Sequence, residues 1–337
     1  TLNRMELSSG MADRYHKIRY WRDSVDDLLV TLFLEAHPAP PEQIILDIDT
    51  TDLALHGKQE GRFFHGYYGH YCYLPLFIFC GDHVLCARLR PSNVGPAVGS
   101  KREIERVVRG IRQRWPKVRI ILRGDSGFCV DELMSWCEDN QVDFVFGMAR
   151  NPRLVGLVAD ARTQARQEFE KTGQAARVFV EFEHETLSGS WSRKRRVVAK
   201  AEHIDGKSNP RFVVTSLSKA EIEAKSLYEN TYCARGDMEN RIKEQFVLFA
   251  DRVSASTMRA NQLRLYLSVM GYTLMNGLRR LALKATTLAA AQVGTIRLKL
   301  FKIGALIQVT VRKVWVRMAS SYPNQELFGQ ALQQLRH

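Results

Sequence analysis

The stretch Gln43-Ile-Ile-Leu-Asp-Ile-Asp49 is the part of the sequence that decides the fold. It is a short apolar run with β-branched residues, which predicts a buried strand. Side chains alternate along a strand, so Asp47 and Asp49 are expected on the same face of it. The strand therefore places two carboxylates near one end of a buried sheet.

The apolar segments that follow are arranged in an order that predicts a mixed sheet. The predicted strands lie at residues 43–49, 71–80, 83–90, 117–122 and 143–147, and the predicted helices lie at residues 100–115 and 130–140. Gly81-Asp82 forms the turn of a hairpin between the second and third strands. Three hairpin-joined strands followed by α/β crossovers predict an α/β fold, a mixed sheet with helices on its faces.

The rest of the chain divides by pattern into further regions. Apolar residues at helical spacing predict a helix within residues 11–36 and a long one at Ala260 to Leu283. A polar helical run to about Thr172 and alternating strands at residues 177–185, 194–203 and 211–217 predict a β-rich insertion. Residues 296–318 fit a helix in part and a strand in part.

We therefore expect four regions. They are an N-terminal helical segment at 1–42, a catalytic core at 43–149 and 226–290, a β-rich insertion at 150–225, and a C-terminal region at 291–337. Because the first residue is Thr1 and no start Met precedes it, upstream sequence is expected to be missing.

The composition favours a polyanionic partner. Lys and Arg total 49 against 36 Asp and Glu, a formal net charge of +13 over 337 residues, and nucleic acid is the commonest large polyanion. The six cysteines are dispersed, without a C-x-x-C pair, which predicts reduced, buried thiols in a cytoplasmic protein. No apolar run of membrane-spanning length and no signal peptide is visible, so no membrane partner is expected.

Three carboxylates far apart in the sequence are candidates for one site. Asp49 ends the first strand, Asp125 follows the fourth, and Glu239 begins a helix after the sheet, so the three can meet over one sheet edge. Carboxylates without clustered His or Cys favour Mg²⁺ or Mn²⁺, and two such ions could clamp a phosphodiester. For any one acid alone, capping a turn or pairing with an Arg is the better interpretation.

The segment Tyr232-Cys-Ala-Arg235-Gly-Asp-Met-Glu239 has the composition of a site. If the chain is helical from about Asp237, Arg235 stands one turn before Glu239, and Tyr232 just before that. Phenol, guanidinium and carboxylate are then expected to converge on one side.

Taken together, these motifs resemble the three catalytic motifs of the DDE transposases of bacterial insertion sequences. The motifs are Leu46-Asp47-Ile48-Asp49-Thr50-Thr51, Arg123-Gly124-Asp125-Ser126-Gly127-Phe128 and Tyr232-x-x-Arg235-Gly-x-Met-Glu239-Asn. The insertion-sequence family numbered thirteen-eighty is similar in further segments: His56-Gly-x-Gln59-Glu60-Gly61, Gly66-Tyr67-Tyr68, Leu89-Arg90-x-x-Asn93 and Asn261-Gln262-x-Arg264-Leu265.

The resemblance implies a ribonuclease-H-like catalytic core with a β-rich insertion before the last catalytic helix. It also implies that the missing upstream sequence holds a DNA-binding region. It also implies a magnesium-dependent (or manganese-dependent) endonuclease and strand transferase that uses two ions. Asp49, Asp125 and Glu239 would be the catalytic acids and metal ligands, accompanied by Tyr232 and Arg235. Relatives keep a Lys seven residues after the Glu, where this chain has Phe246, so Lys243 is a candidate substitute.

The first acid has an alternative, because Asp47 shares a face with Asp49. The Asp-x-Thr pattern of the relatives fits Asp49-Thr50-Thr51, and Asp49 is also nearer the end of the strand. Asp47 could instead hydrogen-bond a group behind the site.

Further residues are candidates for DNA contact. Arg193, Lys194, Arg195 and Arg196 form a basic turn in the insertion, either as phosphate contacts or as a solvated turn. Trp191 could stack on a base, although packing against its own hairpin is the stronger interpretation. His56 could act as a general base, but a loop histidine that touches DNA fits at least as well.

The predicted function is cut-and-paste DNA transposition. One implied partner is double-stranded DNA, namely transposon terminal inverted repeats and target DNA. The other is a second copy of the chain, in a homodimer on DNA. The implied location is the bacterial cytoplasm, at the nucleoid. A nuclease without strand transfer and a non-catalytic DNA-binding remnant are the alternatives. A covalent tyrosine mechanism through Tyr232 is disfavoured, because the Arg and His partners that it needs are not arrayed around that residue.

Overall fold

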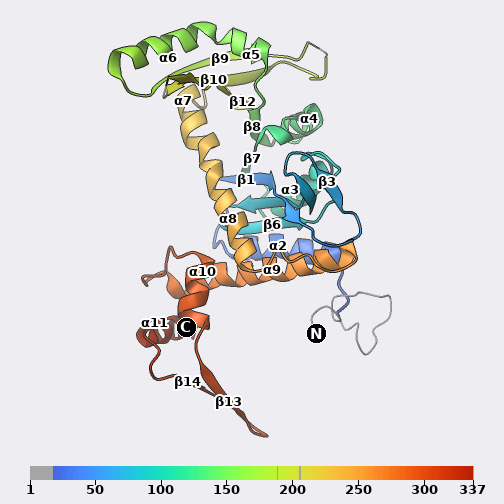
Figure 1. Ribbon diagram of the computed structural model, residues 1–337, viewed down its shortest axis with the longest axis vertical. Helices are drawn as coiled ribbons and strands as arrows, with labels where there is room; N and C mark the ends of the chain where they lie inside the picture. Colours follow the sequence, from blue (N-terminus) through green and yellow to red (C-terminus); the bar gives the residue numbers. More distant parts are fainter. Residues whose placement is uncertain (1–17, 188, 205, 337) are drawn as a thin grey trace.

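The computed structural model describes residues 18–187, 189–204 and 206–336. The molecule is elongated (Figure 1). Strands β9 and β10 lie at one end, the central strands lie in the middle, and the C-terminal hairpin lies at the other end. The predicted helix at residues 11–36 corresponds to α2 (Arg22–Glu35), and the part of that prediction before residue 18 lies outside the described residues.

The central sheet contains both parallel and antiparallel strand pairs. At its centre, β1 (Gln43–Thr50) pairs antiparallel with β5 (Leu76–Cys80) and parallel with β7 (Arg119–Gly124). Beyond them, β6 (His83–Arg88) pairs antiparallel with β5, and β8 (Asp143–Met148) pairs parallel with β7. The prediction of a mixed sheet flanked by helices is therefore confirmed.

Side chains of the sheet alternate between two cores. Leu76 and Ile78 of β5 lie in a core that includes residues of α2, α3 (Ser100–Arg114) and α4 (Asp131–Asp139). Phe77 and Phe79 lie in a second core with residues of α8 (Gly236–Val247) and α9 (Met258–Leu278). Successive side chains of a strand point to opposite faces of the sheet, so a strand that is buried on both faces contributes to both cores.

One predicted strand proved to be two. The segment at residues 71–80 breaks at Leu74-Pro75, since Pro has no N–H to give to a ladder. Its first part, β4 (His70–Tyr73), belongs to a small separate sheet with β2 (Leu53–Ala54) and β3 (Phe63–His65).

Residues 150–225 contain two helices and four strands. These elements are α5 (Pro152–Leu157), α6 (Ala159–Thr172), β9 (Ala176–His184), β10 (Arg195–Ile204), β11 (Lys207–Ser208) and β12 (Arg211–Thr215). Because β12 pairs antiparallel with β8, these strands extend the central sheet, which has nine strands among the described residues.

A helical segment then leads from these strands back along the central sheet (Figure 1). It comprises α7 (Ala224–Ser226), the wide turns of η2 (Leu227–Tyr232), the tight turn η3 (Cys233–Arg235) and α8 (Gly236–Val247). The chain is thus helical well before the predicted start near Asp237, and its regular α-helix begins at Gly236.

The long predicted helix is α9 (Met258–Leu278), continued by η4 (Arg279–Leu283). It is fixed to the sheet edge by Gln262, which accepts a hydrogen bond from the Leu89 N–H (2.7 Å) and donates to the Ala87 carbonyl (2.9 Å). These bonds satisfy backbone groups of the edge strand that would otherwise be buried without partners.

The ambiguous segment at residues 296–318 contains both kinds of structure. Helical turns α10 (Val293–Ile296) and η5 (Arg297–Phe301) precede a hairpin of β13 (Ala305–Val309) and β14 (Val314–Met318), and α11 (Gln325–Gln334) follows. Among the described residues, no helix combines the length and apolarity needed to cross a membrane.

The expectation of buried cysteines is only partly correct. All six thiols are free, and Cys72, Cys86 and Cys137 are buried. Cys80 and Cys129 are half-buried, whereas Cys233 is exposed because it lies in the short η3 turn.

Candidate active site

The three predicted acids are brought to one region by three different elements. Asp49 lies at the end of β1, Asp125 follows the last residue of the parallel neighbour β7, and Glu239 lies in the first turn of α8. The charges of Asp125 and Glu239 both act on Asp49. The sheet edge therefore collects carboxylates that are up to 190 residues apart in the chain.

Arg235 joins two of these acids. Its Nη1 lies 2.9 Å from Asp49 Oδ2 and its Nη2 lies 3.1 Å from Glu239 Oε1. The second contact follows from the i,i+4 spacing on a helical segment. One guanidinium thus connects the strand to the helix, and the convergence predicted for Arg235 and Glu239 is present.

Burial makes Asp49 an unusual carboxyl group. The pKa of Asp49 is raised to about 6, mainly by desolvation. Asp125 and Glu239 also raise it, whereas Arg235 lowers it. Its two oxygens are held by the Thr50 N–H (2.8 Å) and by Arg235. A cation bound here would stabilise the charged form of Asp49.

Asp125 is positioned by a tight turn, η1 (Ser126–Phe128). Its Oδ1 accepts a hydrogen bond from the Gly127 N–H at 2.8 Å. A Cβ at Gly124 would lie 2.9 Å from Ile48 Cγ2, and a Cβ at Gly127 would lie 2.8 Å from Pro96. Both glycines are therefore required by close packing around this acid.

Behind that turn, Arg90 holds the loop that carries Pro96. The buried guanidinium donates to the carbonyls of Leu74 (3.1 Å), Pro96 (2.9 Å) and Val98 (2.6 Å). Burial lowers the pKa of Arg90 to about 10. The Leu89-Arg90 segment thus supports the turn of Asp125 through Pro96.

Asp47 lies behind the site in a buried ion pair. Arg123 Nε lies 2.5 Å from Asp47 Oδ1, its Nη2 lies 2.7 Å from Oδ2, and its Nη1 donates to the Thr231 carbonyl. Arg123 therefore ties β1 and β7 to the helical segment that carries Glu239. Sequence reasoning missed this residue, although an Arg directly before the Gly-Asp of the second motif was a usable signal.

The donor set suits a hard divalent cation, since all three side chains offer carboxylate oxygens. Asp125 Oδ2 and Glu239 Oε2 make no hydrogen bond to the described residues. Within the described ranges, no three His, Cys, Asp or Glu side chains are grouped closely enough to hold a metal ion as they stand. The guanidinium of Arg235 is the cation that links Asp49 and Glu239 here.

The other residues predicted near the site have different positions. Tyr232 is half-buried, and its pKa is raised by burial, lowered by Arg235 and raised by Asp125. Lys243 is exposed one turn after Glu239 on α8, whereas Phe246 packs against the core. His56 is exposed in the loop between β2 and β3.

The basic turn of the 150–225 region separates into two kinds of residue. The side chains of Arg195 and Arg196 are 2% and 9% exposed and are paired with Asp131, Glu138 and Glu181. Arg193 and Lys194 are 50% and 63% exposed. Only the second pair is available to a large partner.

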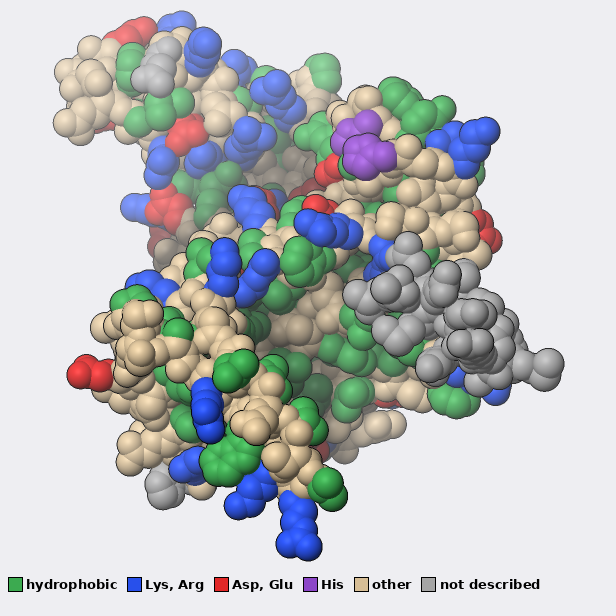
Figure 2. All heavy atoms as spheres, turned by 60° about the horizontal axis from the view of Figure 1, so that its bottom comes forward, with side chains coloured by type: hydrophobic (Ala, Val, Ile, Leu, Met, Phe, Trp, Pro, Cys, Tyr) green, Lys and Arg blue, Asp and Glu red, His purple; other side chains and the backbone are tan. Residues whose placement is uncertain are grey.

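Trp191 is packed against its own hairpin. Its ring meets His184 edge to face at 5.5 Å, and the guanidinium of Arg195 lies 5.6 Å from its ring centre. Elsewhere on the surface, Lys and Arg side chains are spread over the face shown in Figure 2, with few carboxylates among them.

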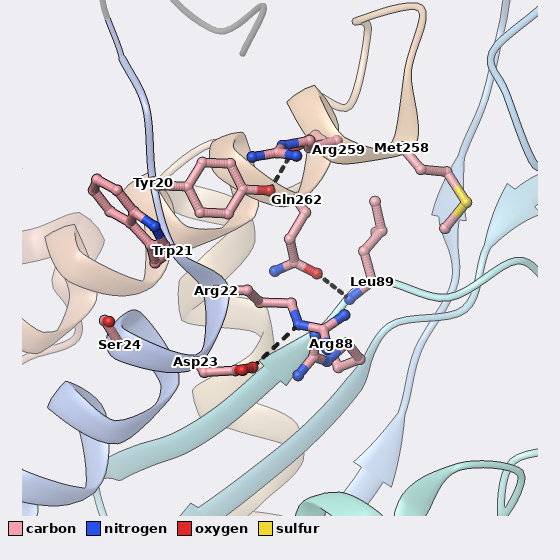
Figure 3. A pocket seen from close by; sticks show the side chains of 10 residues that line it. All are labelled: Tyr20, Trp21, Arg22, Asp23, Ser24, Arg88, Leu89, Met258, Arg259 and Gln262. Carbon is pink, nitrogen blue, oxygen red and sulfur yellow. Dashed lines mark hydrogen bonds and ion pairs between the residues drawn. The ribbon is translucent and has the colours of Figure 1, made fainter. Parts of the chain in front are cut away.

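A further cavity lies apart from these acids. It measures about 670 Å³ and lies between α2, β6 and the start of α9 (Figure 3). Two of its polar groups are partnered within the protein: Tyr20 Oη donates to the Arg259 carbonyl, and Gln262 accepts from the Leu89 N–H. None of the three predicted acids lines this cavity.

Comparison with known proteins identifies the family. The model of the family described as "Transposase DDE domain group 1" matches residues 1–337. No curated protein matches the chain.

Among solved structures, the chain is similar to piggyBac transposase in a cryo-EM structure of its synaptic complex with hairpin DNA. The TM-score is 0.43 at 10% sequence identity, and the match covers 74% of this chain and 49% of the piggyBac chain. The chain thus spans about half the length of that relative. With the family model matched from end to end, the chain belongs to the transposase DDE domain group 1 family.

Proposed function

We propose that this chain catalyses metal-dependent cleavage of DNA at transposon ends and transfer of the cut strand into target DNA, by a cut-and-paste route. The observation that carries the proposal is the meeting of Asp49 and Glu239 at Arg235, with Asp125 acting on the same group. Family membership supports the same assignment.

Asp49, Asp125 and Glu239 are the proposed ligands of two Mg²⁺ or Mn²⁺ ions. Such ions, when bound, supply Lewis acidity for the attacking and leaving oxygens of a phosphodiester. Arg235 is bound to Asp49 and Glu239 in the free chain, and we assign it to a DNA phosphate when those acids take up cations. Its planar guanidinium can donate two parallel hydrogen bonds to a phosphate.

Tyr232 and Lys243 are proposed to contribute further phosphate contacts, because they flank Arg235 and Glu239 on the same helical segment. The exposed Arg193 and Lys194 are proposed to hold DNA farther from the acids, and the exposed His56 to contact it from its loop. The net charge of +13 supports attraction to the DNA backbone.

The proposed partners are double-stranded DNA, as terminal inverted repeats and target, and a second copy of this chain. Joining two ends requires them to be held together, which a symmetric homodimer does with one site per end. The proposed place of action is the nucleoid of the bacterial cytoplasm.

A strand-transfer assay tests the proposal. DNA that carries the element's own ends, pre-cut and labelled, is incubated with Mn²⁺ and a supercoiled target, and a joined product is expected. Asp125→Ala and Glu239→Ala should abolish both cleavage and joining, whereas the exposed Glu132→Ala should retain both.

Three results would count against the proposal in different ways. Cleavage without joined product supports a nuclease that does not transfer strands. Binding without cleavage supports a non-catalytic remnant. Cleavage that survives both acid substitutions places the chemistry elsewhere.

A further inference from the structure

The hairpin of β13 and β14, here called the arm (residues 305–318), has no covering layer. All residues of both strands are exposed, and the arm extends away from the rest of the chain (Figure 1). Within the described residues, the two strands pair only with each other. An isolated two-stranded hairpin is at best marginally stable in water, so a partner is expected to cover it.

The pairing register gives the arm one face that is entirely apolar, because side chains alternate along each strand. The pairs on this face are Ala305 with Met318, Ile307 with Val316, and Val309 with Val314. The five larger side chains among them are 44% to 72% exposed. The other face is mixed, with Gln308 opposite Trp315 and Leu306 opposite Arg317. An exposed, contiguous apolar face of this kind marks a site of protein contact.

The arm is held firmly at its base. The Ala319 N–H donates to the Gly304 carbonyl (2.9 Å) where the hairpin joins the chain. In the preceding turns of η5, Leu300 is buried in the second core, and Arg297 donates to the Val247 carbonyl of α8 (2.7 Å). The arm is thus anchored to the body of the chain, which lowers the entropy that a contact through it would lose.

Helix α9 has another apolar face without a cover. Leu267 and Leu274 lie two turns apart on one side of this helix, and Leu281 follows in η4. All three side chains are exposed, and Leu274 is 75% exposed. Since this face and the face of the arm are both exposed, neither covers the other within one chain.

A second copy of the chain can cover both faces at once. In a two-fold dimer, a contact between the arm of one copy and α9 of the other occurs twice. The six side chains of the arm and the three leucines would remove on the order of 500 Å² of apolar surface per copy. Since apolar atoms make up about 60% of an interface, the whole contact is on the order of 800 Å² per copy, as in a standard stable interface.

DNA fits these two faces less well. Its phosphates are bound by Lys and Arg, and neither apolar face includes a charged side chain. The cations of the arm lie elsewhere, with Arg317 on the mixed face and Arg312 and Lys313 in the turn between the strands. The apolar faces therefore favour a protein partner.

We propose that the arm of one copy packs its apolar face on α9 of a second copy, and that the reciprocal contact makes the chain a dimer in the absence of DNA. The inference rests on the proposed function for the choice of partner, because joining two ends requires two copies. It adds the surface through which the copies meet.

Sedimentation velocity at micromolar protein concentration, without DNA or metal, tests the proposal. The natural sequence should sediment as a dimer. Ile307→Glu/Val316→Glu in the arm and Leu274→Glu in α9 should each sediment as a monomer, because each places carboxylates in an apolar contact. A one-to-one mixture of these two variants should again contain dimer, since the natural arm of one can bind the natural α9 of the other. Recovery of the dimer also shows that both variants are folded.

Gln308→Glu is the matched control, because it adds a carboxylate to the mixed face of the same strand, and it should keep the dimer. A monomeric natural protein, or a dimer that persists in either apolar-face variant, would overturn the proposal. A mixture that stays monomeric would exclude the contact between arm and α9. A dimer that persists while the arm variant loses DNA affinity would assign the arm to DNA instead. Because neither DNA nor metal is present, failure of this dimer and failure of the proposed catalysis are separate outcomes.

Discussion

Arg235 lies 2.9 Å from Asp49, a residue 186 positions earlier in the chain, and the same guanidinium reaches Glu239. The contact draws the first helical turn of α8 onto the end of β1. In the free chain it also offsets part of the negative charge that three carboxylates would otherwise share.

Arg235→Ala is expected to separate metal binding from catalysis. Manganese affinity, measured by titration calorimetry, should be kept, because the carboxylates remain and a competing cation is removed. DNA cleavage should fall roughly a hundredfold, as is typical when one charged transition-state contact is lost. Arg241→Ala, which removes an arginine of the same helix that pairs with Asp82, is the control. A loss of manganese binding as large as that of Asp125→Ala would contradict the assignment.

The two acids of β1 are expected to differ in their effect on stability. Asp47→Asn breaks the buried pair with Arg123 and leaves a buried charge, which costs about 3–5 kcal/mol. In Asp49→Asn at pH 8 without metal, the free energy of unfolding should not fall. The pKa of Asp49 is raised to about 6 in the folded chain, so the carboxylate form that is present at pH 8 destabilises the fold. Urea denaturation of both variants measures the contrast. Equal losses would show that Asp49 is also a structural acid.

Gly124→Ala should disturb the site through packing. The new methyl group would lie 2.9 Å from Ile48 Cγ2 and 3.2 Å from Phe128, which costs about 1–3 kcal/mol in a packed interior and displaces Asp125. Thermal denaturation and cleavage should both decline. Gly156→Ala is the matched control, since a Cβ there meets no described atom within 4 Å. If both variants behaved alike, the close approach at Gly124 would not matter.

Features that depend on local periodicity could be predicted from the sequence, and features that depend on distant partners could not. The alternation around Asp47 and Asp49 and the helical spacing of Arg235 and Glu239 are local, so the strand at Asp49 and the contact of Arg235 with Glu239 could be predicted. Arg195 gave no such signal, because its partners Asp131 and Glu138 lie some 60 residues away in sequence. The pairing of β12 with β8 is likewise a long-range contact that no local pattern encodes.

His83 should make the protein sensitive to acid. Burial, with the nearby charges of His37 and Arg280, lowers its pKa from 6.5 to about 4, and its ring packs on Phe33. The unfolded chain therefore binds a proton more readily than the folded one, so stability is lost as the pH falls from about 6.5 to about 4. At pH 5 this difference in proton binding by His83 lowers the free energy of unfolding by roughly 2 kcal/mol.

In His83→Gln, the free energy of unfolding measured by urea denaturation between pH 7 and pH 5 should decline less than in the natural sequence by that amount. His56→Gln is the control, because that side chain is exposed. The same pH dependence in the natural sequence and in His83→Gln would exclude His83 as the cause.

Arg193 and Lys194 are expected to contact DNA phosphates, whereas Arg195 is expected to stabilise the fold. The first two side chains are mostly exposed, and Arg195 is buried with Asp131 and Glu138, each at 2.7 Å. If each exposed cation neutralises one phosphate, Arg193→Ala/Lys194→Ala should lower the slope of log affinity against log salt concentration by about 2. Its thermal stability should stay unchanged. Arg195→Ala should instead lower the melting temperature, because Asp131 and Glu138 lose the hydrogen bonds of the buried guanidinium. The salt dependence of DNA binding by the folded protein should be kept. An unchanged slope in the double variant would remove this turn from the DNA-binding surface.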